Sequence, residues 1–154
     1  MERKAIIEFK DFTAHYTVQS KPTLNNINLT IYEGEKILIA GPSGSGNSTL
    51  ANCINGLIPF STDIEISGSL KIKGKETKDL SVFEISKMVG TVLQDPDSQF
   101  IGLTVAEDIA FKLENNCVSQ EEMKKKVNYV SKIVDIENRL DLAPYSLSVD
   151  KNRG

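Results

Sequence analysis

The sequence has no apolar run of 18 residues and no excess of basic charge. Its 154 residues carry a net charge of −3 at pH 7, with 18 lysines and arginines against 21 acidic residues. A transmembrane helix needs about 20 predominantly apolar residues, so the first absence argues against a membrane-spanning segment. The second absence argues against nucleic acid as a partner, because a nucleic-acid-binding face concentrates lysine and arginine.

Cysteine and histidine are also scarce. Cys53 and Cys117 are the only cysteines, and they lie far apart without the spacing of a metal or redox motif. Two reduced thiols in a cytosolic protein are the expectation for such a pair. His15 is the only histidine, and we expect it at the surface or packed on a strand.

A glycine-rich stretch dominates what the sequence does contain. Residues 41–49 read GPSGSGNST, follow the apolar run Ile37–Ala40 and precede a plausible helix, Leu50–Asn55, closed by Gly56. Strand, glycine-rich loop and helix form the context of a phosphate-binding loop. The glycines allow backbone N–H groups to form an anion-binding concavity, and the helix adds free N–H groups and the positive end of its dipole.

One position of this loop departs from the usual pattern. Phosphate-binding loops read G-x-x-x-x-G-K-[ST], and here Asn47 occupies the lysine position while Ser48 keeps the hydroxyl that reaches Mg²⁺. The alternative interpretation is a Gly/Ser turn that joins a strand to a helix. The agreement of the other positions and of the flanking elements favours the phosphate-binding loop.

Apolar patterns predict a mainly β-stranded first part. Ala5–Phe12 and the alternating segment Ile27–Ile31 are predicted strands, and Leu70 and Ile72 lie in a predicted edge strand. Ile37–Ala40 and Met88–Leu93 are apolar throughout, as expected of strands covered on both faces.

Three S/T-x-x-E patterns predict helix starts, at Ser81–Glu84, Thr104–Glu107 and Ser119–Glu122. The second helix should run to about Glu114. The third should carry one apolar face and expose Lys124–Lys126 to water. That apolar face comprises Met123, Val127, Val130 and Val134. The whole pattern indicates an α/β protein with an antiparallel portion at its front.

The chain resembles the first part of an ABC-transporter ATP-binding subunit. The segments that carry the resemblance are TLNNINLTI (23–31), Glu33–Glu35, VLQDP (92–96) and TVAEDIAF (104–111). The chain is most similar to the energy-coupling-factor type, which powers import of vitamins or cobalt-like cations and includes thiamine-precursor importers. The resemblance covers essentially all 154 residues and implies a P-loop nucleoside triphosphatase fold, with the ATP core followed by the start of a helical subdomain.

The resemblance also assigns roles to individual residues. Tyr16 would stack on adenine, Ser48 and Gln94 would help to coordinate Mg²⁺, and Gln94 would also sense the γ-phosphate. A strand-end tyrosine and a polar strand-end glutamine are the alternatives for Tyr16 and Gln94. The residues that would hold the phosphates are Gly41, Ser43, Gly44, Ser45, Gly46, Asn47, Ser48 and Thr49.

The cofactors implied are ATP and Mg²⁺. The implied partners are a transmembrane transporter subunit and a second ATP-binding subunit, in a homodimer or heterodimer. The expected location is the cytoplasm, peripheral to the inner face of the cell membrane.

The chain departs from the family where the signature Leu-Ser-Gly-Gly-Gln-Lys-Gln-Arg belongs. Leu147-Ser148 is followed instead by residues 149–154, VDKNRG, and the later parallel strands, second acidic strand end, catalytic glutamate and switch histidine do not follow. Phosphoryl transfer needs a positioned water and groups that stabilise charge. We therefore expect weak MgATP binding and no useful hydrolysis by this chain alone.

The genetic code offers an explanation for residues 149–154. Deleting one G from AGT GGT GGA CAA AAA CAG AGG G yields AGT GTG GAC AAA AAC AGA GGG. The first reading encodes the signature from its serine onward, and the second encodes SVDKNRG, the sequence from Ser148 to Gly154. A frameshifted tail is the expectation, and an authentic short tail is the alternative.

Two functions of other classes remain open at this point. A small phosphoryl-transfer enzyme, such as a kinase, would use the same loop but needs a basic lid, and the three arginines form no cluster. A non-catalytic nucleotide-binding or transporter-docking module would need none of the missing groups.

Overall fold

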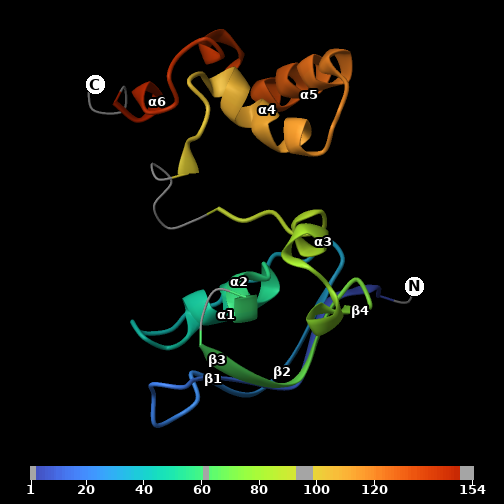
Figure 1. Cartoon of the computed structure of the whole chain (residues 1–154), viewed down its shortest axis with the longest axis vertical. Coiled ribbons are helices and arrows are strands. Elements are labelled where there is room, and N and C mark those ends of the chain that lie inside the picture. Colours follow the sequence, from blue (N-terminus) through green and yellow to red (C-terminus); the bar gives the residue numbers. More distant parts are fainter. Residues whose placement is uncertain (1–2, 61–62, 93–98, 150–154) are drawn as a thin grey trace. The chain divides into compact units, whose positions relative to one another are not determined.

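The computed structural model describes residues 3–60, 63–92 and 99–149 (Figure 1). The chain divides into two compact units, Met1–Thr91 and Val92–Gly154. The first unit contains the sheet and the glycine-rich loop, and the second is helical. We describe each unit by itself.

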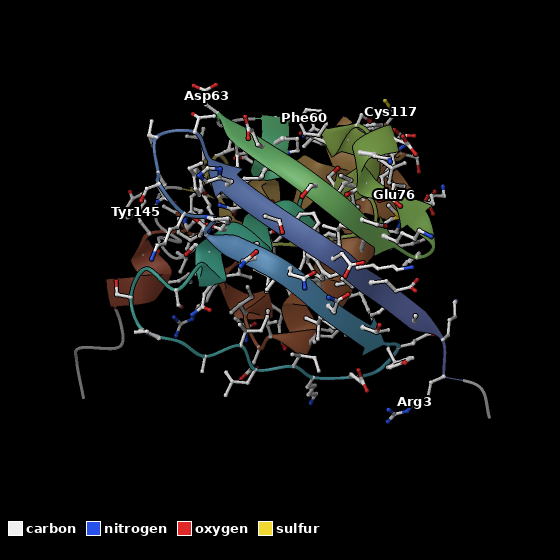
Figure 2. The ribbon with its side chains drawn as sticks, turned by 90° about the horizontal axis from the view of Figure 1, so that it is seen from below. Arg3, Phe60, Asp63, Glu76, Cys117 and Tyr145 are labelled. Carbon is white, nitrogen blue, oxygen red and sulfur yellow. The ribbon has the colours of Figure 1, made fainter. Side chains whose placement is uncertain are left out.

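An antiparallel sheet forms the first unit. Its strands are β1 (Ala5–Tyr16), β2 (Leu24–Tyr32), β3 (Ile64–Ile72) and the short β4 (Lys75–Glu76), in the order β2-β1-β3-β4. Figure 2 shows the three long strands side by side. Apolar β-branched and aromatic residues at alternating positions suit such a half-covered sheet.

A bulge in β1 sets the local shape of the sheet. Asp11 has φ 47°, and the pairing of β1 shifts around it with both neighbouring strands. The side-chain oxygen of Asn28 accepts a hydrogen bond from the Asp11 N–H at 3.0 Å, so the displaced backbone group is satisfied. On β3, Gly68 lies against the bulge: a Cβ there would lie 2.7 Å from the Lys10 carbonyl oxygen and closer still to that of Asp11. Only glycine fits this approach.

Two helices, α1 (Asn47–Ile54) and α2 (Leu57–Phe60), lie on one face of the sheet (Figures 1 and 2). The short η1 (Thr77–Asp79) and α3 (Val82–Ser86) follow β4. The core between the sheet and the helices is a cluster of buried residues. Its members are Phe9, Phe12, Ala14, Leu24, Leu50, Cys53, Ile58 and Leu70.

Three strand predictions are confirmed as parts of the sheet, and one detail of them is wrong. β1 and β2 contain the predicted segments, and β3 contains Leu70 and Ile72. That end of β3 is not an edge, because Lys71 pairs with Glu76 and Ile72 with Lys75. The chain turns back at Gly74 and returns for only two residues, too few for a periodicity to predict.

Both predicted buried strands are wrong within the described residues. Ile37–Ala40 has no strand hydrogen bonding, and Leu38 is 90% exposed. Residues 88–92 are likewise not a strand, with Val92 91% exposed, and Leu93 lies outside the described residues. An apolar run becomes a buried strand only when neighbouring strands pair with it, and none of the described strands pairs with either run.

The second unit is built of helices α4 (Val105–Asn115), α5 (Gln120–Ile133) and α6 (Ser146–Val149), with the 3₁₀ turn η3 (Glu137–Arg139). In its described part, as in that of the first unit, no helix has the length and apolarity to cross a membrane.

The predicted helix starts are confirmed. Ser81 and Thr104 form reciprocal capping boxes with Glu84 and Glu107. Ser119 accepts a hydrogen bond from the Glu122 N–H at 3.4 Å and so caps α5. These local bonds satisfy N–H groups that a helix start otherwise leaves without partners.

The predicted faces of α5 are confirmed in part. Lys124–Lys126 are exposed and Val127 is buried. Val130 is 41% exposed and Val134, which lies just beyond the last turn of α5, is 55% exposed. The helix ends before Val134, so the predicted apolar stripe is shorter than its periodicity indicated.

Candidate functional site

The glycine-rich loop folds as a tight turn that leads into α1. The Ser45 N–H donates to the Pro42 carbonyl at 3.1 Å, and Gly44 takes φ 81°, the value required at the third residue of a type II turn. Gly46 follows with φ 94° and precedes the first residue of α1. A Cβ on Gly46 would lie 3.0 Å from both the Thr23 carbonyl oxygen and Leu24 Cδ2. The loop therefore packs closely on the start of β2.

The start of α1 provides backbone N–H groups beside the loop that could donate to a bound anion. The first helical bond joins the Leu50 N–H to the Gly46 carbonyl at 2.8 Å. The N–H groups of Asn47, Ser48 and Thr49 precede this bond and have no partner within the helix. No acidic residue occupies the first turn of α1, so the positive end of the helix dipole is not neutralised there. This end of α1 suits an anion.

A cavity of about 600 Å³ lies over the loop. Its lining comprises Gly41–Thr49 together with Tyr16, Gln19, Pro22 and Thr23. Hydroxyl, amide and backbone N–H groups therefore dominate the wall. Of the described residues that line the cavity, none carries a charged side chain.

Asn47 occupies the position where the pattern has lysine. Its side-chain nitrogen lies 3.6 Å from the point that a Cβ on Gly41 would occupy, so the amide folds toward the start of the loop. An amide donates a neutral hydrogen bond and adds no charge. The attraction of this cavity for an anion therefore rests on N–H groups, hydroxyls and the helix dipole.

The structure brings Tyr16 to the loop. Its hydroxyl oxygen lies 3.2 Å from Thr49 Oγ1, and the tyrosine lines the same cavity. Its ring also packs against the core cluster, so the side chain is half-buried. The residues that we expected in the phosphate-binding loop line the cavity as well, whereas Gln94 lies outside the described residues.

Sequence reasoning missed Gln19 and Thr23 as cavity residues. They belong to the turn between β1 and β2. His15 is half-buried at the end of β1, and its Nε2 lies 2.7 Å from the Gln19 carbonyl oxygen. The polar residues directly after Tyr16 were the available signal, but composition alone does not distinguish a binding turn from a solvated one.

The donor set fits Mg²⁺ only as a companion of a ligand. No group of three or more histidine, cysteine or acidic side chains is placed to hold a metal in the part of the chain that the structure describes. Ser48 lies in the cavity wall and offers one hydroxyl. Mg²⁺ commonly takes one or two protein oxygens and completes its shell with phosphate oxygens and water. Cys53 and Cys117 are free thiols, as expected, and burial raises the pKa of the Cys53 thiol to about 11.

This chain is similar to known proteins over most of its length. The family model described as ABC transporter matches residues 24–153. An ABC transporter ATP-binding protein of Clostridium perfringens is 99% identical over 148 residues, which cover 96% of this chain and 26% of the relative. A second such protein, from Enterococcus faecalis, is 58% identical over 146 residues, covering 95% of this chain and 26% of the relative.

A solved structure has a fold similar to that of this chain. The structure of cbiO1 from Clostridium perfringens, part of the ABC transporter complex cbiONQ, matches with a TM-score of 0.77 and 27% identity. The match covers 91% of this chain and 54% of that chain. The chain spans about a quarter of the length of the curated relatives it matches. The family model covers most of the chain, and the chain belongs to the ABC transporter family.

Proposed function

We propose that this chain is the nucleotide-binding part of an ABC importer's ATP-binding subunit, of the energy-coupling-factor type. The observation that carries the proposal is the cavity formed by the loop at Gly41–Thr49 with Tyr16 at its wall. The likeness to cbiO1, part of a transporter complex, supports the energy-coupling-factor type. Such a subunit would couple ATP binding and hydrolysis to transport across a membrane.

In this proposal the cavity holds a nucleoside triphosphate. The loop amides and the start of α1 bind the phosphates, with hydroxyls from Ser43, Ser45 and Thr49 nearby. Tyr16 presents its ring to adenine, and its contact with Thr49 holds the ring beside the loop. When bound, Mg²⁺ would neutralise phosphate charge, and Ser48 and Gln94 would supply its protein oxygens.

Asn47 makes this a weak site with little catalytic power. A hydrogen bond to a charged group contributes about 1.5–3 kcal/mol, so loss of the lysine should weaken binding by roughly 10- to 100-fold. The rate should suffer more, because charge develops on the γ-phosphoryl oxygens during transfer. We therefore propose weak MgATP binding and no useful hydrolysis by this chain alone.

The proposed partners are a transmembrane transporter subunit and a second ATP-binding subunit, the same or different. The proposed location is the cytoplasmic face of the membrane. The likeness to a subunit of a transporter complex supports both. Hydrolysis in this family needs the signature of one subunit over the nucleotide of its partner, and Leu147-Ser148 begins that signature here.

The frameshifted tail remains a proposal as well. The match to the Clostridium perfringens relative spans 148 of the 154 residues, so a stretch as long as 149–154 lies outside it. Residues 150–154 lie outside the described part of the structure. Sequencing the locus decides the matter, because the proposal requires the family signature to continue in the neighbouring frame.

A second candidate is a nucleotide-binding module without catalysis. It is favoured by Asn47 and by the absence of charged side chains among the described residues that line the cavity. Titration of the chain with MgATP, alongside a phosphate-release assay, tests the nucleotide site that both candidates share. We expect Asn47→Lys to tighten MgATP binding by 10- to 100-fold, while turnover stays near zero. Asn115→Lys, which adds the same charge at an exposed position of α4, is the control and should leave affinity unchanged.

The proposed function fails if the chain and Asn47→Lys both show no MgATP binding. Steady turnover by the unmodified chain, lost in Ser48→Ala, would contradict the proposed inactivity. Turnover restored by adding the remaining family segments and a membrane subunit to Asn47→Lys would favour the importer over the non-catalytic module.

A further inference from the structure

The turn between β1 and β2, residues 17–23, supplies the part of the cavity wall that the glycine-rich loop does not. Gln19, Pro22 and Thr23 line the cavity beside Tyr16. The Gln19 N–H donates to the Tyr16 carbonyl at 2.9 Å, so the glutamine is tied directly to the tyrosine. The backbone of Gln19 therefore lies beside that of Tyr16, the residue proposed to stack on adenine.

Hydrogen bonds hold Gln19 from three sides. Besides the bond to Tyr16, the Gln19 carbonyl oxygen lies 2.7 Å from His15 Nε2. The Gln19 side-chain oxygen accepts from Thr23 Oγ1 at 2.6 Å. The two backbone bonds hold the main chain of Gln19, and the bond from Thr23 holds its side-chain amide.

These hydrogen bonds determine which end of the Gln19 side-chain amide remains available to a ligand. Because the Thr23 hydroxyl occupies Oε1, the Nε2 group of Gln19 is left as a donor of two hydrogens. Thr23 is itself fixed: its N–H donates to the Ala14 carbonyl at 3.0 Å, and its carbonyl oxygen packs against Gly46. The donor is therefore tied to both the sheet and the glycine-rich loop.

We propose that Gln19 is a specificity-determining residue that donates from Nε2 to an acceptor atom of the nucleoside, on the base edge or the ribose. His15 acts as its positioning residue by donating from Nε2–H to the Gln19 carbonyl. This inference rests on the proposed nucleotide site. No described residue of the cavity wall carries a charged side chain, so one fixed neutral donor contributes a larger share of the affinity than it would beside a lysine.

The test compares two ligands that share phosphates but differ in the nucleoside. The full chain is titrated by calorimetry with MgATP and with magnesium tripolyphosphate. Gln19→Met keeps the length of the side chain and removes the donor. We expect it to weaken MgATP binding by about three- to tenfold, the range for one neutral hydrogen bond, and to leave tripolyphosphate binding within twofold. Gln120→Met, on the exposed start of α5, is the matched control.

The role of His15 is tested with the same ligand pair. His15→Ala should weaken MgATP binding by less than Gln19→Met and spare tripolyphosphate. His15→Gln, which keeps a donor of comparable reach, should restore most of the loss. A role confined to supporting the fold predicts equal losses for both ligands and no rescue.

The outcomes separate this inference from the proposed function. If the parent chain binds MgATP and Gln19→Met binds it equally well, the inference is wrong and the proposed function stands. Equal weakening toward both ligands also overturns the inference, because the turn would then support the phosphate loop only. If the parent binds neither ligand, the proposed function itself fails.

Discussion

The two units of this chain are built from different kinds of contact. In the sheet unit, Ile7 of β1 pairs with Ile31 of β2 and with Ile72 of β3, so the fold depends on segments far apart in the sequence. In the helical unit, α4 and α5 consist of bonds within a few residues and begin at local caps. Local structure therefore forms from its own sequence, whereas a strand needs partners supplied from elsewhere.

The largest expected effect is a difference in the rate at which the two cysteine thiols react, because each unit holds one of them. Cys53 lies on α1 and is buried in the core cluster. Its raised pKa of about 11, against the usual 9.0, leaves about 100-fold less thiolate at neutral pH. Cys117 is exposed in the helical unit. We expect a thiol reagent at pH 7.5 to label Cys117 at least about 100-fold faster.

Mass spectrometry of timed reactions measures both labelling rates, and Cys117→Ser isolates the slow one. Denaturant should bring the two rates together, because unfolding removes the burial that protects Cys53. Equal rates in buffer would mean that the sheet unit opens freely around α1 and would contradict the described core.

Two glycine substitutions should show how much more stability is lost when a long-range contact is disturbed than when only local backbone strain is added. Gly68→Ala places a methyl group against the Asp11 backbone across two strands, and we expect a loss of about 3 kcal/mol in the free energy of unfolding. Gly74→Ala, with φ 77° and open space around it, should lose only about 1 kcal/mol.

Urea unfolding followed by circular dichroism measures both losses. The two glycines share a positive φ, so their difference reports the contact with the bulge alone. If Gly68→Ala lost no more than Gly74→Ala, the close approach of β3 to Asp11 would be wrong.

Removing a helix cap should lower the stability of its helix by the same amount in both units, because a cap acts locally. Ser81→Ala removes the cap of α3 and Thr104→Ala that of α4, each with an expected loss of about 1 kcal/mol. Hydrogen exchange of the first-turn amides measures the local effect in each helix. A loss confined to the sheet unit would show that the second unit's helices do not depend on their caps.

The smallest expected effect is a difference in the salt dependence of two carboxyl groups. Hydrogen bonds from the Ser81 backbone and side chain lower the pKa of Glu84, whereas the Lys126 side chain, by hydrogen bond and charge, lowers the pKa of Glu122. Each lowered pKa stabilises the folded state above about pH 4.5, and this contribution is lost as the pH falls through the folded-state pKa.

Salt screens charges more than it weakens backbone hydrogen bonds. In NMR titrations, 0.5 M salt should therefore raise the pKa of Glu122 toward its ordinary value and leave that of Glu84 nearly unchanged. Ser81→Ala should raise the pKa of Glu84 and leave that of Glu122 alone. An equal response of both groups to salt would contradict the assigned causes.

The accuracy of the sequence predictions follows the same division between local and distant contacts. Ser81, Thr104 and Ser119 marked helix starts correctly, because a cap and its partner lie three residues apart. The loop at residues 41–49 could also be predicted, since glycine spacing dictates its turn and the helix behind it. Gln19 and Thr23 could not be predicted, because their place in the cavity depends on how β1 and β2 pair.

The amino-acid sequence by itself determined the glycine-rich loop, the presence of Asn47 where the pattern has lysine, the capped helices and the resemblance to the family. These features depend on residue type and short spacing. Only the tertiary structure decided that Tyr16 and the turn at 17–23 join the loop around one cavity, and that Ile37–Ala40 remains outside the described sheet. The physical reason is that a strand is defined by the hydrogen bonds of its neighbours, and a binding site by elements that converge from distant parts of the chain.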